Sequence, residues 1–166
     1  MQLKPRIAPC LWFDSQAEQA AAFYISVFKN SRIVSVSRYG DAGREIHQRP
    51  AGSVMAVTFE LDGQPFTALN GGRVFKFNEA VSLQVFCENQ KEIDFYWNAL
   101  STGGDPRAQQ CGWLKDQFGL SWQVVPAVLN ELLKDYNSET AQRALDAMLH
   151  MKKLDIAELE RAVAVA

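Results

Sequence analysis

The chain has 166 residues, of which 48% are hydrophobic and 22% are charged. These values suit a globular chain of one domain or two small repeats, and they exclude a disordered or collagen-like chain. With 17 Lys and Arg against 19 Asp and Glu, the net charge of −2 gives no overall attraction to nucleic acid or to an anionic membrane.

The cysteines and the N-terminal residues of the sequence indicate the cellular compartment of the protein. Cys10, Cys87 and Cys111 are an odd number, widely spaced, without a CxxC pair, so a disulfide framework is not expected. No apolar run is long enough to cross a bilayer, and the start MQLKPRIAPCLWF lacks the features of a signal peptide. We expect a cytoplasmic protein with no membrane partner.

The first half of the chain predicts strands around one helix. In chain order, the expected elements are a strand over 7–13, a helix opened by a capping box at 15–18, a strand over 32–39, a loop over 40–53, a strand over 54–61 and its hairpin partner over 64–69. The apolar residues from Ala17 to Phe28 recur at helical spacing, and Asp62-Gly63 suits a two-residue hairpin turn.

The second half repeats this plan. The expected elements are a strand over 81–87, a helix capped by Asn89 with apolar residues from Ile93 to Leu100, and strands over 109–115 and 120–125 around a turn. The order and spacing of Asp14, Gln16 and Glu18 recur at Glu88, Gln90 and Glu92. We infer that one unit, a strand followed by a capped helix, occurs twice.

The rest of the chain predicts a helical tail. Pro126 suits a first helical position, and Ser138 and Asp155 can cap two further helices. We therefore expect paired modules over 1–126, divided at about 1–72 and 73–126, and a tail over 127–166. The apolar stripes of the tail must pack on the chain's own fold or on a partner subunit.

Alternation along the strands predicts a sheet with one apolar face and one mixed face. On 81–87, for example, Val85 and Cys87 share one face, whereas Gln84 and Phe86 share the other. A sheet with helices on one side and a curved, mixed face on the other is a natural small-ligand pocket. A half-solvated antiparallel sheet alternates in the same way, so alternation leaves both interpretations open.

Several runs resemble the PhnB-like family. They are PCLWFD (9–14), AAAFY (20–24), LNGG (69–72), FKFNEAVS (75–82), CGWLKDQFGLSWQVVP (111–126) and AMLHMKKLDI (147–156). The resemblance covers nearly the whole chain, and 111–126 is a specific run. This family is part of the vicinal oxygen chelate superfamily, with glyoxalase, bleomycin-resistance and extradiol dioxygenase proteins, and often bears the name 3-demethylubiquinone-9 3-methyltransferase.

The resemblance implies an α+β fold in which two βαβββ modules form a curved mixed sheet, commonly in a homodimer. In metal-dependent members, four strand positions supply His and Glu ligands. Here these positions fall at or next to Pro9, Ala68, Ser82 and Gln123, of which Gln123 is a weak ligand and the others are not ligands of the required kind. We therefore expect neither a metal site nor another cofactor.

Two residues remain as weak catalytic candidates. Glu60 could point into the pocket as a base or a lone metal ligand, or it could be a solvated strand residue. Cys111 could be a nucleophile if a base lay nearby, or it could have a packing role. The only two histidines, His47 and His150, are expected in a loop and in the tail as surface or packing residues.

The methyltransferase name has little support in the residues. A typical S-adenosylmethionine fold needs a Gly-rich turn after its first parallel strand, whereas the first strand here leads into a helix cap at 14–16. The Gly-rich run 69–72 follows a hairpin strand and predicts a turn. Basic residues are isolated rather than gathered in a stripe, so we expect no nucleic-acid partner.

The expected ligand cavity combines aromatic and hydrogen-bonding side chains. Its residues are Asn70, Phe75, Asn78, Ser82, Gln84, Phe86, Trp113 and Gln123. The sequence thus predicts a metal-free small-molecule-binding protein of the vicinal oxygen chelate type, as a homodimer. The alternatives are an enzyme, either the named methyltransferase or a metal-assisted glyoxalase-like lyase or isomerase, and a scaffold whose cavity is filled by its own phenylalanines.

Overall fold

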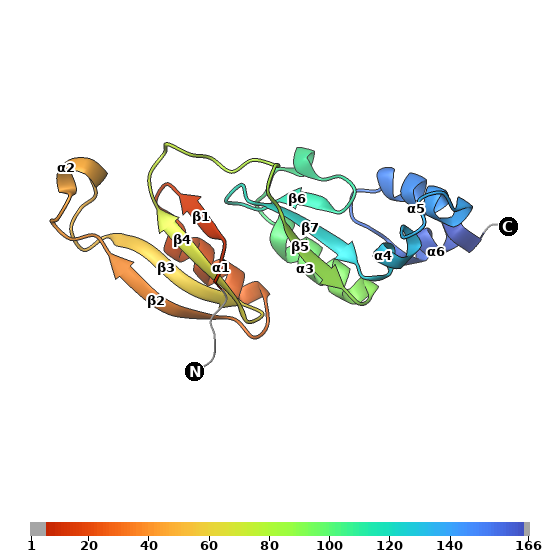
Figure 1. Cartoon of the computed structure of the whole chain (residues 1–166), viewed down its shortest axis with the longest axis horizontal. Helices are drawn as coiled ribbons and strands as arrows, with labels where there is room; N and C mark the ends of the chain where they lie inside the picture. Colours follow the sequence, from red (N-terminus) through yellow and green to blue (C-terminus); the bar gives the residue numbers. More distant parts are fainter. Residues whose placement is uncertain (1–5, 165–166) are drawn as a thin grey trace. The chain divides into compact units, whose positions relative to one another are not determined.

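The computed structural model describes residues 6–164 and divides the chain into two units, the first ending at Lys76 and the second beginning at Phe77. Each unit contains one mixed β-sheet with a helix against it (Figure 1). The α+β class expected from the sequence is confirmed. The division follows residue 76 rather than 72, and the C-terminal helices belong to the second unit.

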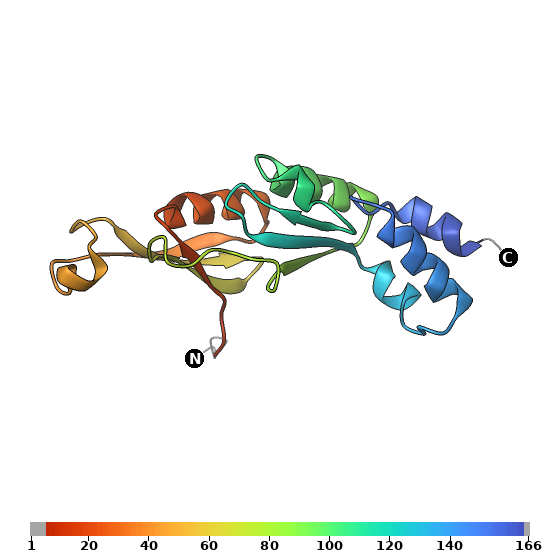
Figure 2. The same ribbon diagram turned by 90° about the horizontal axis from the view of Figure 1, so that it is seen from above.

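The first unit has a four-stranded sheet in the order β1-β4-β3-β2. Its strands are β1 (Cys10–Phe13), β2 (Arg32–Arg38), β3 (Val54–Leu61) and β4 (Gln64–Asn70). The β1 strand runs parallel to β4, and the other neighbours are antiparallel. Helix α1 (Ala17–Val27) lies on one side of this sheet (Figure 2), and the short helix α2 (Arg44–His47) interrupts the expected loop.

Side-chain size and alternation explain how α1 packs. Ala20 and Ala21 are fully buried, and the Tyr24 ring stacks on Phe59 of β3 with their centroids 6.4 Å apart. Alternate residues of β3 turn toward the helix, so Glu60 lies on the opposite, open face.

The hairpin turn between β3 and β4 forms as expected. Asp62 and Gly63 have φ values of 47° and 77°, and two successive positive values are what a type I′ turn requires.

The capping box expected at residues 15–18 does not form. Gln16 is the N-cap residue of α1, and no side-chain bond of its own caps the helix. Asn70 Oδ1 instead accepts a hydrogen bond from Ala17 N at 2.8 Å. The buried side-chain amide of Asn70, at the end of β4, therefore caps α1 in place of the local capping box that the sequence predicted.

The second unit has a sheet in the order β5-β7-β6. Its elements are β5 (Leu83–Cys87), α3 (Gln90–Ser101), the 3₁₀ turn η1 (Pro106–Ala108), β6 (Trp113–Lys115) and β7 (Ser121–Pro126). Among the described residues this sheet has three strands, whereas a complete βαβββ module has four. The expected strand over 109–115 is shortened to β6, because Cys111 and Gly112 have positive φ values of 52° and 81° and form a turn there.

The tail consists of α4 (Val128–Leu132), α5 (Glu139–Leu149) and α6 (Ile156–Ala164). Its apolar cluster with the end of β7 comprises Val125, Leu129, Met151, Leu154 and Leu159. Cys111 N and Gly112 N donate to Met151 O and Lys152 O, both at 2.8 Å, so backbone hydrogen bonds fix the tail to its own unit. No described helix is both long and apolar enough to cross a membrane.

Candidate functional site

A cavity of about 510 Å³ lies in the second unit. It is lined by Glu79, Ala108, Gln110, Cys111, Trp113, Leu114, Lys115, Ser121, Met148 and Leu149. These residues come from the segment before β5, the segment before β6, the two strands β6 and β7, and the end of α5. A volume of this size is typical of sites for small organic molecules.

The register between β6 and β7 forms one wall of the cavity. Trp113 lies opposite Gln123, and Lys115 lies opposite Ser121. Directly opposed residues of an antiparallel pair point to the same face. The intervening residue Leu114 is buried and alternates to the face that packs against α3.

Asp116 holds the turn that fixes this register. It is buried, its Oδ1 accepts from Phe118 N at 2.8 Å and Leu120 N at 3.1 Å, and its Oδ2 accepts from Trp122 Nε1 at 2.8 Å. A carboxylate is suited to this role because it accepts several hydrogen bonds at once. The turn therefore sets Lys115 and Ser121 side by side.

A left-handed turn carries Cys111 to the cavity. Cys111 and Gly112 have φ values of 52° and 81°, and a Cβ on Gly112 would lie 2.9 Å from Val124 O. The Cys111 Sγ lies 3.7 Å from Leu149 O of the tail. Of the two histidines, His47 belongs to the first unit, and His150 Nδ1 lies 2.8 Å from Asp146 O. The contact that the structure gives the Cys111 thiol is thus with a carbonyl oxygen, not with a base.

Ser121 is the unusual polar residue of the cavity. It is 1% exposed, and among the described residues its hydroxyl has no hydrogen-bond partner. Leaving a buried polar group unpaired costs about 1–3 kcal/mol. A hydrogen-bond acceptor in the cavity would remove that cost.

Lys115 supplies the positive charge at the cavity. Its Nζ forms an ion pair with the Glu79 carboxylate, and their side chains are 25% and 64% exposed. The hydrogen bond from Lys115 is the main reason that the pKa of Glu79 is below its ordinary value. The carboxylate is therefore ionised at neutral pH while it holds the ammonium.

Several of the expected cavity residues lie together on the same face of this sheet. Gln123 Nε2 donates to Ser82 Oγ at 2.7 Å, and Gln84 Nε2 lies 3.3 Å from Gln123 Oε1. Trp113 is the next residue across the sheet, opposite Gln123, and Phe86 is exposed further along β5. The expected hydrogen-bonding residues Ser82, Gln84 and Gln123 thus lie together, and they bond to one another.

The remaining expected residues lie elsewhere. Asn78 is exposed before β5, and its Oδ1 accepts from Ala80 N at 3.0 Å. Glu60 pairs with Arg32 Nε at 2.8 Å on the open face of the first sheet. Phe75 of the first unit meets the Trp12 ring edge-on at 4.9 Å.

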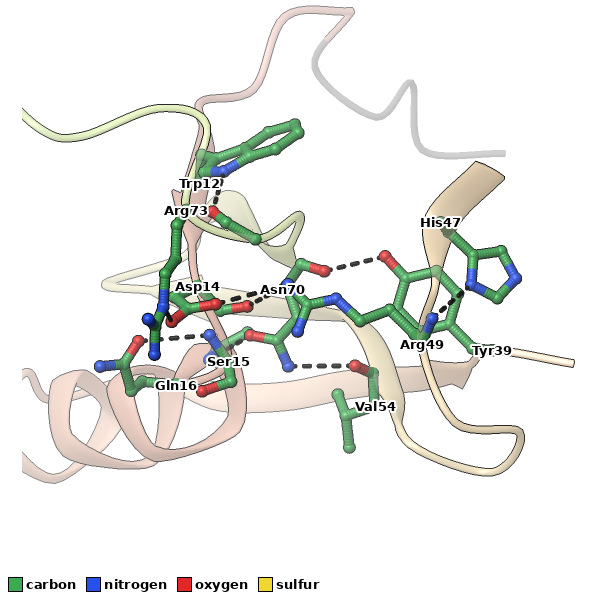
Figure 3. Close-up of polar contacts among 12 residues, drawn as sticks. Trp12, Asp14, Ser15, Gln16, Tyr39, His47, Arg49, Val54, Asn70 and Arg73 are labelled. Carbon is green, nitrogen blue, oxygen red and sulfur yellow. Dashed lines mark hydrogen bonds and ion pairs between the residues drawn. The ribbon is translucent and has the colours of Figure 1, made fainter. Parts of the chain in front are cut away.

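Asn70 occupies the centre of a polar network at the start of α1 (Figure 3). Besides capping Ala17, its Nδ2 donates to Val54 O at 3.0 Å, and its backbone oxygen accepts from Tyr39 Oη at 2.8 Å. Asn70 is 7% exposed, and its side chain bonds groups on the α1 side of the sheet. These bonds give it a structural role that the sequence did not reveal.

Asp14 extends the same network. Its Oδ2 accepts from Arg73 Nε at 2.8 Å, and its backbone oxygen accepts from Arg49 Nη2 at 3.0 Å (Figure 3). The hydrogen bond from Arg73, followed by that from Arg49, lowers the pKa of Asp14. A cavity of about 310 Å³ adjoins this network, lined by Ser15, Glu18, Gln19, Arg49, Pro50, Ser53, Val54 and Asn70. The polar groups shown in Figure 3 bind one another, which favours a structural role.

The residues at the metal positions of the superfamily do not fit a metal centre. Ala68 is fully buried, and Ser82 and Gln123 offer only a hydroxyl and an amide, bonded to each other. Within residues 6–164, no three His, Cys, Asp or Glu side chains gather as ligands would. Zinc, nickel and iron centres require such donors.

Sequence reasoning missed several cavity residues. They are Glu79, Gln110, Lys115, Ser121, Met148 and Leu149. Only Ser121 carried a usable signal, since it alternates with the buried Trp122, so it belongs to the mixed face. Met148 and Leu149 reach the cavity from α5 through long-range packing, which no local pattern reports.

Comparisons with known proteins identify what the chain is similar to. A family model described as 3-demethylubiquinone-9 3-methyltransferase matches residues 5–125. The PhnB protein of Bacillus cereus, described by the same activity, has 37% identity over 74% of this chain and 100% of its own, with a TM-score of 0.63. No curated protein matches at a significant level.

Fosfomycin resistance proteins named FosX share the fold. The protein from Listeria monocytogenes, solved with Mn(II) and sulfate, has 15% identity and a TM-score of 0.51 over 82% of this chain and 100% of its own. The protein from Mesorhizobium loti has 14% identity and a TM-score of 0.54, over 80% and 99%. Identities this low show the fold alone.

Proposed function

The chain belongs to the 3-demethylubiquinone-9 3-methyltransferase family, the PhnB-like branch of the vicinal oxygen chelate superfamily, and we propose that it binds a small organic molecule in the cavity of its second unit. The family resemblance noted in the sequence is confirmed. The observation that carries the proposal is the buried hydroxyl of Ser121, which has no hydrogen-bond partner within residues 6–164 and lies in a largely apolar cavity. Sites for small ligands combine apolar walls with a few such polar groups.

The proposed binding needs no metal ion. Trp113, Met148 and Leu149 offer apolar contact, and Ser121 and Lys115 offer hydrogen-bond donors, so the chain's own side chains supply both parts of recognition. By the family resemblance, Pro9, Ala68, Ser82 and Gln123 lie at or next to the positions that hold a metal in metal-dependent members.

The experiment is a fragment screen by ligand-observed NMR on the full chain, followed by titration of the Ser121→Ala and Trp113→Ala variants. Loss of the hydroxyl should weaken a bound fragment about tenfold, because an unmade hydrogen bond in a buried site costs about 1–2 kcal/mol. Ser26→Ala is the matched control, since Ser26 is exposed on α1, away from the cavity lining and from β2. Fragments that bind Trp113→Ala as well as they bind the unmodified chain would contradict the site.

The methyl-transfer alternative rests on the family description. It predicts intrinsic binding of S-adenosylmethionine, so this compound belongs among the first tested. Elemental mass spectrometry of chain purified without a tag or chelator tests the metal-free part, and near-stoichiometric Ni, Zn, Fe or Mn would contradict it.

We also propose that the protein is a cytoplasmic homodimer. Strand β2 lies at the end of its sheet and is exposed along its whole length, and Ile33, Val34 and Val36 are apolar side chains on it. An edge strand of this kind can pair with another chain. Light scattering after size-exclusion chromatography tests the dimer, and a mass of one chain would contradict it.

All three cysteines are free thiols, which suits a reducing compartment, and cell fractionation tests this location.

A further inference from the structure

We infer that the ligand of this cavity is an apolar molecule bearing a carboxylate, and that Glu79 occupies the position of that carboxylate in the free protein. The inference rests on the proposed function, because it names the chemistry of the same cavity. Three groups carry it: the Lys115 ammonium, the Ser121 hydroxyl and the Glu79 carboxylate.

The Lys115 ammonium is held at the cavity by the sheet. Lys115 ends β6, lies opposite Ser121 in the register, and has a side chain that is 25% exposed. A partly desolvated cation needs a negatively charged or hydrogen-bonding partner. Lys115 is therefore a fixed feature of the cavity that requires some anion beside it.

The Glu79 carboxylate is the exchangeable half of the pair. Glu79 lies in a turn before β5 rather than in a strand, and its side chain is 64% exposed. An exposed carboxylate regains water when it leaves its partner, so such ion pairs contribute little net stability. A ligand carboxylate that also gains contacts inside the cavity can thus displace it.

The unpaired Ser121 hydroxyl explains why a ligand carboxylate would be the better partner. A carboxylate has two oxygens, of which one can accept from Lys115 Nζ and the other from Ser121 Oγ. In the free protein, Glu79 pairs with Lys115 and leaves Ser121 unpaired among the described residues. A neutral ligand could pair with Ser121 and accept a hydrogen bond from the ammonium, but it would lack the charge–charge attraction that makes a carboxylate the stronger partner.

The rest of the cavity indicates the body of the ligand. Trp113, Met148 and Leu149 line it with one aromatic ring and two flexible aliphatic side chains. Such a lining suits a small aromatic or branched aliphatic group. Met148 and Leu149 belong to the end of α5, beyond residues 5–125, the range that the family model matches.

The experiment compares 3-phenylpropionate with its neutral amide, 3-phenylpropanamide, by titration calorimetry on the full chain. The acid should bind more tightly than the amide. Glu79→Gln should tighten binding of the acid about 2- to 5-fold by removing the competing carboxylate, and it should leave the amide unchanged. Lys115→Gln should weaken binding of the acid about tenfold or more and should weaken binding of the amide much less, because the amide loses no charge–charge attraction.

Glu139→Gln is the matched control. It removes an equally charged side chain from an exposed ion pair with Arg143 on α5, outside the cavity lining, so it should change neither affinity. Equal affinity of acid and amide, or weaker binding of the acid by Glu79→Gln, would overturn the carboxylate inference while leaving the proposed cavity intact. Failure of both probes to bind the unmodified chain and Glu79→Gln, together with an empty fragment screen, would overturn both proposals.

Discussion

Replacing Ser121 by alanine should stabilise the free protein while weakening its ligand. The side chain is 1% exposed, and its hydroxyl has no partner among the described residues. Replacing Ser121 by alanine removes the free-energy cost of burying an unpaired hydroxyl, which is about 1–3 kcal/mol. The lost packing of one atom offsets part of this gain, at about 0.5–1 kcal/mol. The unfolding free energy of Ser121→Ala should therefore rise by about 0.5–2 kcal/mol.

The assay is urea unfolding and thermal melting at neutral pH, with and without 3-phenylpropionate. For a chain of this length, 1 kcal/mol shifts Tm by about 2–4 °C. Ligand that binds only the folded state raises Tm according to its affinity, so the acid should raise the Tm of Ser121→Ala less than that of the unmodified chain. If the unfolding free energy of Ser121→Ala without ligand is lower than that of the unmodified chain by about 1 kcal/mol or more, the hydroxyl has a structural partner and the reasoning is refuted. Ser26→Ala, at an exposed position of α1 where the hydroxyl bonds only the local Phe23 O, should change Tm little.

The remaining predictions concern one helix start, one turn and one carboxyl. Asn70→Ala should destabilise the chain by about 1–3 kcal/mol in urea unfolding, because it leaves the buried Ala17 N unpaired and removes the bond to the partly buried Val54 O; an unchanged midpoint would contradict the capping role. Gly112→Ala should cost about 2 kcal/mol or more, since its φ is 81° and the new Cβ would lie 2.9 Å from Val124 O, whereas Gly40→Ala, with nothing within 4 Å of its Cβ, is the control. Arg107 lowers the pKa of Asp105 to about 2, so the stabilisation from this pair is complete above the ordinary carboxyl pKa and is lost as pH falls toward 2. A carboxyl NMR titration should give Asp105 a pKa of about 2, returning to the ordinary range in Arg107→Gln; an ordinary value in the unmodified chain would refute the pairing.

Local signals in the sequence succeeded where the partner lies nearby along the chain. The Asp62-Gly63 turn sets its own hairpin, and Asn89 caps α3 because its Oδ1 accepts from Glu92 N at 3.1 Å, three residues away. The Ser138 cap forms in the same manner, with Ala141 N 3.1 Å from its Oγ. Each of these structures is decided by fewer than five consecutive residues.

Local signals failed where a distant group competes. The box at residues 15–18 has the right residue types, but Asn70 caps α1 from the end of β4. The strand expected over 109–115 is interrupted by the turn at Cys111 and Gly112, whose backbone N–H groups donate to Met151 O and Lys152 O of the tail, and only β6 remains as strand. The cavity depends on the same contacts, because Leu149 lies 38 positions from Cys111.

The two units resemble each other in plan but differ in how they satisfy their polar groups. In the first, Asn70 bonds two backbone groups, Ala17 N and Val54 O, and accepts from the Tyr39 hydroxyl. The Asp14 carboxylate accepts from Arg73 and Arg49. In the second, the Asp116 carboxylate accepts three hydrogen bonds, from Phe118 N, Leu120 N and Trp122 Nε1. Ser121, five residues later, has no hydrogen-bond partner among the described residues.

A buried donor without a partner reduces stability, and a structural role for Ser121 would have favoured either a partner or an apolar residue. Ser121 lies beside Lys115, whose ammonium pairs with the exposed carboxylate of Glu79. One cavity therefore holds both a hydroxyl that lacks a hydrogen bond and an ammonium whose carboxylate partner can be replaced. A bound carboxylate would resolve both at once, which is why the ligand is expected there rather than at the saturated network around Asn70.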